Sequence, residues 1–102
     1  MEVFKEALPC EITGAFKSLS KEENQRVMNY LMCRYEDGNF VSFKEMEKEL
    51  GYHSQELNSI IKELFEGGLI ISVADEAGYY FQPSTFGRKF MYKILEMLEE
   101  VR

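Results

Sequence analysis

Residues 43–65 read FKEMEKELGYHSQELNSIIKELF and contain two apolar stripes at helical spacing. In the first stripe Phe43, Met46 and Leu50 recur at helical intervals, and Gly51 follows as a residue type that commonly ends a helix. Two short helices joined by a tight turn are typical of a helix-turn-helix. The second stripe lies beyond the turn and consists of Leu57, Ile60, Ile61, Leu64 and Phe65.

The polar side of the second helix is a candidate binding surface. Gln and Asn side chains can form two hydrogen bonds with adenine, and Ser can bond to several bases. The solvated face of any amphipathic helix would have a similar composition, so both interpretations stay open. The residues on this side are Gln55, Glu56, Asn58, Ser59, Lys62 and Glu63.

On the DNA-binding interpretation, the polar residues of this helix divide into two roles. Gln55, Asn58 and Ser59 contact base edges, and Lys62 contacts the phosphate backbone. Further phosphate contacts come from the preceding helix and from the helix before it. These candidates are Lys44 and Lys48, with Arg26 or Arg34 as possible additions.

Length and composition indicate one folded domain spanning residues 1–102. A chain of 102 residues can enclose a single core, and 45% hydrophobic residues with only two prolines are typical of a globular protein. The sequence contains no apolar run near the roughly 18 residues that a membrane span needs. Its first ten residues lack the basic start and apolar centre of a secretory signal. We therefore expect a cytoplasmic protein with no membrane partner.

Capping residues and apolar spacing place the other helices. Residues 11–18 are predicted as a short helix and residues 20–35 as a longer one. A side-chain oxygen before a helix can accept a hydrogen bond from the first turn, and a Glu three residues later can return one. The residues expected to begin helices in this way are Ser20 with Glu23, Ser42 with Glu45, Ser54, and Ser84.

Two runs of β-branched and aromatic residues predict a hairpin. Residues 69–73 and 79–82 flank turn residues, and a final helix follows from Thr85 to the C-terminus. The bulky pair Phe40 and Val41 offers a third strand. The predicted fold is mainly α with a small β-hairpin wing (α+β), in the order α-α-β-α-α-β-β-α. This order is that of a winged helix-turn-helix.

Several motifs occur together in an order that is typical of one protein family. They are residues 15–19, FVSF at 40–43, LG at 50–51, LNSIIKEL at 57–64, GGLII at 67–71, YYF at 79–81 and STFGRKF at 84–90. Over residues 12–98 the chain resembles archaeal ArsR-like winged helix-turn-helix transcriptional regulators. The resemblance implies a dimer whose recognition helix reads the major groove of double-stranded DNA while the wing touches the flanking backbone or minor groove. The wing residues would be Asp75, Glu76, Gly78 and Tyr79.

The sequence departs from this family pattern in its metal ligands and its charge. Metal-sensing members carry paired cysteines in the recognition helix, or carboxylate and histidine ligands on the last helix, and this sequence has neither pattern. The net charge is −6, and Asp75 and Glu76 are the only charged residues of the wing. Binding driven by counterion release needs clustered Lys and Arg. The alternative function is therefore an acidic winged-helix module that binds a protein partner and not DNA.

The last helix indicates a homodimer. Its apolar residues extend around the helix beyond the arc that one core contact needs. A two-fold related copy would cover this arc together with the N-terminal segment, so residues 1–19 and 85–102 contribute to the predicted interface. The predicted interface residues are Phe4, Leu8, Ile12, Met91, Tyr92, Leu95 and Leu98.

The sequence has no recognisable constellation for catalysis, a cofactor or a metal. It contains neither a Gly-rich phosphate loop nor a nucleophile elbow. The single histidine, His53, has no evident acid, base or ligand partner, and a turn or capping role suits it better. Cys10 and Cys33 lack redox or zinc spacing and are expected as reduced, partly buried thiols. We expect no enzyme activity.

Overall fold

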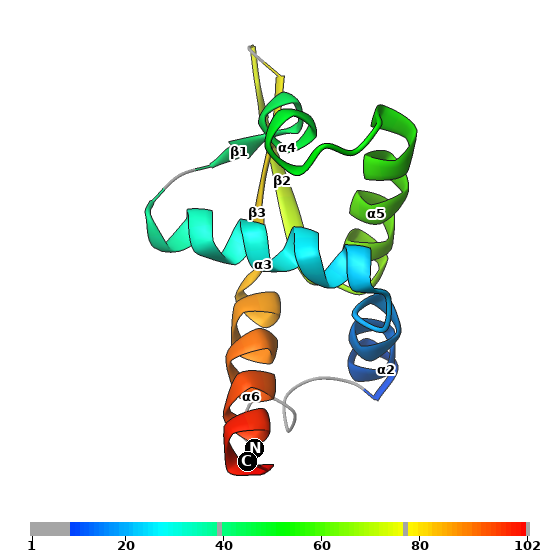
Figure 1. Ribbon diagram of the computed structural model, residues 1–102, viewed down its shortest axis with the longest axis vertical. Coiled ribbons are helices and arrows are strands. Elements are labelled where there is room, and N and C mark those ends of the chain that lie inside the picture. The colour runs from blue at the N-terminus through cyan, green and yellow to red at the C-terminus, as the bar shows by residue number, and fades with distance from the viewer. Residues whose placement is uncertain (1–8, 39, 77, 102) are drawn as a thin grey trace.

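The computed structural model describes residues 9–38, 40–76 and 78–101, with side chains described for residues 13–38, 40–76 and 78–97. The fold is mainly helical with a small three-stranded antiparallel sheet, an α+β arrangement (Figure 1). The interface predictions for Phe4 and Leu8, and for the side chains of Ile12 and Leu98, lie outside the described residues. The elements are α2 (Pro9–Ser18), α3 (Glu22–Glu36), β1 (Val41–Ser42), α4 (Phe43–Leu50), α5 (Ser54–Glu66), β2 (Ile70–Asp75), β3 (Gly78–Pro83) and α6 (Thr85–Val101).

The sheet has the strand order β1-β3-β2, and both pairs of neighbours are antiparallel. Pairing of β1 with β3 confirms a third strand before α4, although it comprises Val41 and Ser42 and does not include Phe40. The hairpin is longer than predicted, since backbone pairing runs from Ile70 opposite Pro83 to Asp75 opposite Gly78. Two residues predicted as part of the turn, Asp75 and Gly78, therefore belong to the strands.

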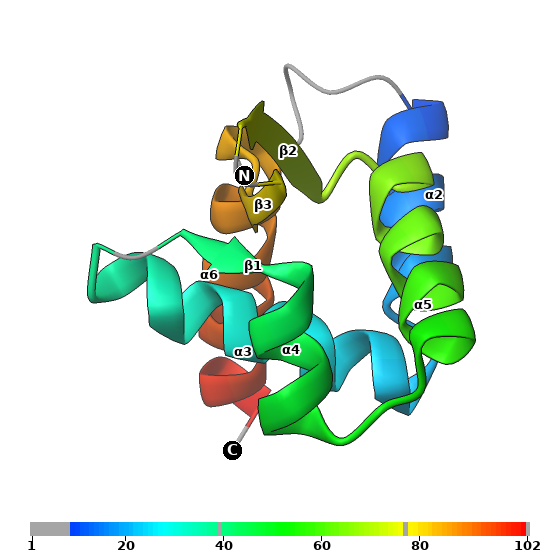
Figure 2. The same ribbon diagram turned by 90° about the horizontal axis from the view of Figure 1, so that it is seen from above.

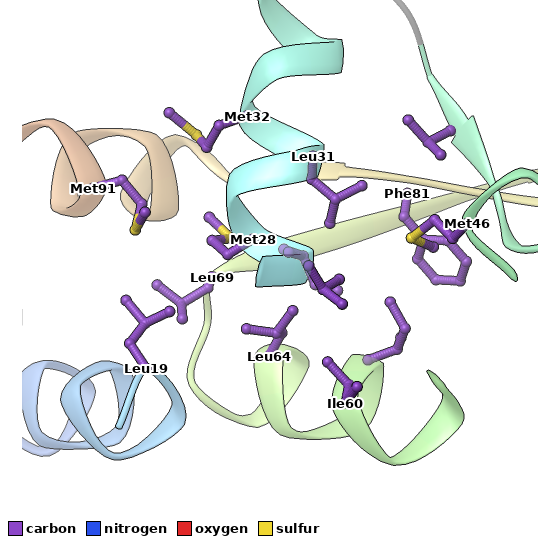
Figure 3. Packing of buried hydrophobic residues seen from close by; sticks show 14 of the residues in the cluster. Leu19, Met28, Leu31, Met32, Met46, Ile60, Leu64, Leu69, Phe81 and Met91 are labelled. Carbon is purple, nitrogen blue, oxygen red and sulfur yellow. The ribbon is translucent and has the colours of Figure 1, made fainter. Parts of the chain in front are cut away.

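Helix α3 crosses the middle of the molecule, and the other elements surround it. The hairpin and α6 extend from it in opposite directions, and α2 packs beside α5 (Figures 1 and 2). One core forms where side chains from these elements meet α3 (Figure 3). Burying a large apolar side chain contributes about 1.5–3 kcal/mol. The largest fully buried apolar residues are Phe90, Met28, Leu31, Met46, Leu57, Leu64 and Leu69.

Two predicted helix caps are confirmed. Ser42 Oγ accepts a hydrogen bond from the Glu45 amide at 3.2 Å, which is half of the expected capping box. Ser84 Oγ accepts from the Gly87 amide at 2.8 Å at the start of α6. Helix α2 begins two residues earlier than the predicted start at residue 11, and Pro9 is its first residue. Proline is tolerated there since the first helical amide has no partner within the helix.

Two other predicted caps are wrong. Ser20 donates its hydroxyl proton to a carbonyl of α2, and Lys21 takes the N-cap position of α3 without a side-chain cap. Ser54 donates to Glu47 Oε2 at 2.7 Å and is itself the first residue of α5, after His53 at the N-cap. In both cases the serine hydroxyl donates to a nearby oxygen and does not cap the helix. Short polar side chains readily form such local hydrogen bonds.

Two side chains lie further from the core than predicted. Cys33 is exposed because it lies on the side of α3 away from the buried stripe that contains Val27 and Leu31. Met97 of α6 continues the apolar spacing of Phe90 and Ile94, which indicates a core position, yet it is 36% exposed. This helix extends beyond the rest of the molecule at that end (Figure 1). Within the described part of the chain, every helix is too short or too polar to span a membrane.

Candidate functional site

The outward face of α5 is formed by five of the six side chains predicted there. Leu57, Ile60 and Leu64 are buried against the core, so the opposite side of the helix faces solvent. The turn before α5 begins at Gly51, whose φ of 75° lies in the left-handed region that favours glycine. The exposed residues of this face are Gln55, Glu56, Asn58, Ser59 and Lys62.

Glu63 was predicted on the same face, and the structure corrects this. One carboxylate oxygen accepts from Lys21 Nζ at 2.6 Å, and the other accepts from Asn24 Nδ2 at 2.6 Å. Asn24 is fully buried and also donates from Nδ2 to the Ser18 carbonyl at 2.7 Å. The Ser18 hydroxyl in turn donates to the Glu63 carbonyl at 2.7 Å. This network fixes the last part of α5 against α2 and the start of α3.

Helical spacing in the sequence indicates that Asn24 is buried, although its side chain is polar. Asn24 precedes Val27, Met28 and Leu31 at helical spacing, so it continues the buried stripe of α3. A buried amide needs hydrogen-bond partners, and the partners here come from distant parts of the chain. Spacing could therefore have identified its burial, but not its contact with Glu63.

The carboxylate network predicts an acid-sensitive contribution to stability. Hydrogen bonds from Lys21 and then from Asn24 lower the pKa of Glu63 below its ordinary value of 4.5. A carboxyl group with a lower pKa in the folded state stabilises the fold above its unfolded pKa and loses that contribution as the pH falls through the folded pKa. Glu63→Gln should therefore lower the free energy of unfolding at neutral pH, and this deficit should shrink in acid.

Urea denaturation of both proteins across the acid range measures that deficit. Glu76→Gln, an exposed change at the hairpin tip, is the control and should show little deficit at any pH. A Glu63→Gln deficit that stays constant from neutral to strongly acidic pH would contradict the assigned pairing.

The lysines predicted to contact phosphate are exposed, and they take part in none of the ion pairs found among the described residues. Several acids near them are instead paired with cations outside α4 and α5. Arg34 of α3 lies 3.3 Å from Glu45 and 3.8 Å from Glu49. The outward surface is therefore less acidic than a count along the sequence suggests. These lysines are Lys44, Lys48 and Lys62.

The additional arginines proposed for phosphate contact already have partners. Arg34 takes part in the ion pairs with α4, and the guanidinium of Arg26 lies 5.4 Å from the centre of the Tyr52 ring. At the start of α6, the guanidinium of Arg88 likewise lies 4.6 Å from the centre of the Tyr35 ring. Such cation–π contacts stabilise the arginine positions but leave fewer directions free for a ligand.

The β2–β3 hairpin presents acidic and aromatic residues at its tip. Asp75 and Glu76 are exposed, and Tyr79 is 65% exposed. Gly78 has a φ of 137°, a backbone conformation that side chains disfavour. The described residues of the hairpin include no Lys or Arg. A contact between this hairpin and a phosphate backbone would therefore lack a cation.

The predicted interface residues on α6 have different surroundings. Tyr92 is 47% exposed and Leu95 is 50% exposed, whereas Met91 is 8% exposed and packs in the core. Phe16 of α2 is also exposed, but its ring meets the edge of Phe90 at a centroid distance of 5.0 Å, and Phe90 lies on a different side of α6 from Tyr92 and Leu95. We call the two neighbouring exposed apolar side chains the α6 patch; it comprises Tyr92 and Leu95, which lie three residues apart on α6.

A metal site does not emerge from the described residues, among which no three His, Cys, Asp or Glu side chains are grouped to hold an ion. His53 lies in the turn before α5, and its side chain does not cap that helix. Neither a protein-family model, nor a curated protein, nor a solved structure matches this chain. A functional proposal therefore rests on the residues of α4, α5, the hairpin and the α6 patch.

Proposed function

We propose that this chain is a winged-helix transcriptional regulator of the archaeal ArsR-like type, which binds double-stranded DNA as a homodimer in the cytoplasm. Helices α4 and α5 serve as the helix-turn-helix, and the β2–β3 hairpin serves as the wing. The observation that carries the proposal is the outward face of α5. Base-reading side chains occupy it beside lysines that have no carboxylate partner among the described residues.

Charge placement supports this proposal despite the net charge of −6. Arg34 forms ion pairs with acids of α4, and Lys21 forms one with an acid of α5. These acids lie on the sides of the two helices that face α3 and α2. Lys44, Lys48 and Lys62 then balance the three acids of these helices that take part in no ion pair among the described residues, which are Glu47, Glu56 and Glu66. Because phosphate attraction decreases over a Debye length of about 10 Å, local charge decides affinity more than the total does.

The α6 patch supports the homodimer. Isolated exposed apolar residues are ordinary, but the neighbouring pair Tyr92 and Leu95 on one side of α6 offers apolar area that a second copy would cover. A two-fold axis through α6 would bury Tyr92 and Leu95 of both copies, each about half exposed in a single chain. Two copies of α5 would then reach successive major grooves if they lay about 34 Å apart.

The hairpin favours a second candidate function, the acidic winged-helix module for a protein partner. Its tip carries Asp75 and Glu76, and β2 exposes Ile71 (41%) and Val73 (47%). Acidic and apolar surface together suits a basic, partly apolar protein surface better than a phosphate backbone. On this alternative, purified protein shows no DNA binding even at low salt while the homodimer remains intact.

A double substitution on α5 tests the preferred function. Asn58→Ala with Lys62→Ala removes one base-reading amide and one phosphate contact, neither of which supports the core. We expect affinity for DNA from upstream of the protein's own coding sequence to fall roughly tenfold to a hundredfold in fluorescence anisotropy.

Lys89→Ala, which removes an exposed lysine of α6, is the matched control and should change affinity little. Equal affinity of the double variant and the wild-type protein for that DNA would exclude α5 as the reading helix.

A further inference from the structure

Strand β2 forms one edge of the sheet, because the strand order is β1-β3-β2 and β2 pairs with β3 alone among the described residues. We call the side of β2 that faces away from β3 the open edge. All residues from Ile71 to Asp75 are exposed, and the hairpin extends away from α3 (Figure 1). With six residues, β2 has an ordinary length for a strand that pairs on both sides.

The backbone groups of β2 alternate in direction between β3 and the open edge. The Ser84 amide donates to the Leu69 carbonyl at 2.9 Å, and these two residues lie opposite each other at the base of the hairpin, in continuation of its register. Opposed residues of an antiparallel pair are alternately hydrogen-bonded and not bonded, so the bonds to β3 continue through Ile71 and Val73. The residues whose amide and carbonyl groups are directed to the open edge are therefore Ile70, Ser72 and Ala74.

The open edge lacks the features that usually prevent strand pairing. Such features are Lys or Pro in the edge strand, or a β-bulge. Strand β2 contains neither residue type, and its pairing with β3 runs without interruption from Ile70 to Asp75. Ser72 and Ala74 are exposed and have small side chains, which leave their backbone groups accessible. An edge of this kind can accept an extended peptide as a further strand.

The side chains beside the open edge indicate the chemistry of such a peptide. Ile71 (41% exposed) and Val73 (47% exposed) lie on one face of β2, and Asp75 follows on the same face. An antiparallel added strand would face Ile71 and Val73 in non-hydrogen-bonded pairs, in which side chains approach most closely. Apolar residues suit these two places. Lys or Arg suits the places beside Asp75 and Glu76, which are both exposed.

We propose that the open edge of β2 binds an extended segment of a partner protein, in which basic residues precede two apolar residues at alternate positions. The segment runs antiparallel to β2, and its basic residues lie beside the acidic tip of the hairpin. This binding does not depend on the proposed contact between α5 and DNA, because the open edge lies on the hairpin and is complete in one chain. The residues whose backbone bonds to the segment are Ile70, Ser72 and Ala74.

A second copy of this chain suits the open edge less well. The described residues of the hairpin include Asp75 and Glu76 but neither Lys nor Arg. Pairing of two such edges would therefore bring together two acidic hairpins without a cation from either. Because like charges placed close together weaken an interface, charge complementarity favours a basic segment.

Hydrogen exchange and NMR titration with a synthetic peptide test this inference without DNA. The probe is Lys-Arg-Thr-Val-Thr-Val-Thr with both ends blocked, at constant ionic strength. The amide signals of Ser72 and Ala74 should shift saturably, and both amides should become about tenfold or more better protected from exchange, since each gains an acceptor. The amides of Ile71 and Val73 already bond to β3, so their protection should rise less.

Two substitutions at one position separate backbone pairing from charge attraction. Ser72→Pro removes an amide directed to the open edge without removing a bond to β3, and should weaken peptide binding by about tenfold or more. Ser72→Thr keeps this amide and is the matched control, with an unchanged Kd. Circular dichroism checks that both variants fold.

Three results would overturn the proposal. One is a wild-type protein in which the peptide leaves the protection of Ser72 and Ala74 unchanged. Another is equal peptide affinity of folded Ser72→Pro and the wild-type protein, which would show that the charge of the hairpin tip alone attracts the peptide. The third is protection of these amides that rises with protein concentration in the absence of peptide, which would assign the open edge to a second copy.

Discussion

Replacement of Gly87 by alanine is expected to destabilise the fold by more than about 3 kcal/mol, a large share of the stability of an ordinary domain. A Cβ at this position would overlap the Leu69 carbonyl oxygen and lie 2.9 Å from its carbon. That oxygen also accepts the Ser84 amide at 2.9 Å, and Leu69 is fully buried. Because the obstacle is buried backbone, α6 would have to move away from the core.

Gly14→Ala is the matched control for this prediction. Gly14 also lies within a helix, but a Cβ there would approach its nearest neighbour, the Gly67 Cα, at an ordinary 3.8 Å. Alanine should gain up to about 1 kcal/mol of helix propensity at this site. Urea denaturation followed by circular dichroism should show a sharply lower midpoint for Gly87→Ala alone. Similar midpoints for the two variants would show that α6 does not pack against Leu69 so closely.

Leu95→Glu is expected to convert the proposed homodimer into a folded monomer. Leu95 is half exposed in the single chain, so glutamate there remains solvated and the core is unchanged. At a two-fold axis the same change would place two carboxylates near each other in an apolar interface, which costs several kcal/mol. A monomer can bind only one of the two DNA half-sites, so we expect DNA affinity to fall by about a thousandfold or more.

Light scattering measures whether the Leu95→Glu variant is a monomer, and circular dichroism measures whether it is folded. Asn29→Glu adds the same charge at an exposed position of α3 and should leave the dimer intact. A wild-type protein that is monomeric at micromolar concentration would contradict the interface, as would a Leu95→Glu variant that stays dimeric.

Local sequence signals predicted most of the architecture. Apolar spacing and Gly51 located α4 and α5, and β-branched runs located the hairpin, because these signals act within one element. Ser42 caps as predicted because its partner is three residues away. Ser20 and Ser54 do not, because each hydroxyl has a competing acceptor that the capping pattern ignores.

Contacts between distant residues were not predictable in this way. Glu63 falls on the polar side of α5 in sequence, yet Lys21 and Asn24 attract it towards α3. Gly87 could be recognised as unusual inside a helix, which often marks a close approach, but its neighbour Leu69 could not be named. The candidate DNA-binding face was predictable as exposed polar surface. The sequence did not predict that nearby acids pair with Arg34 and Lys21, and this pairing changes the charge of the face.

The central claim is that α4 and α5 contact a phosphate backbone through Lys44, Lys48 and Lys62 in each of two protomers. Six such contacts predict a slope of about −5 for log Kobs against log salt concentration. The most direct test is therefore the DNA affinity of the wild-type protein, measured by fluorescence anisotropy at a series of salt concentrations. A slope near −5 with preference for the upstream DNA would support the account. Absence of binding at low salt, or binding that salt barely weakens, would contradict it.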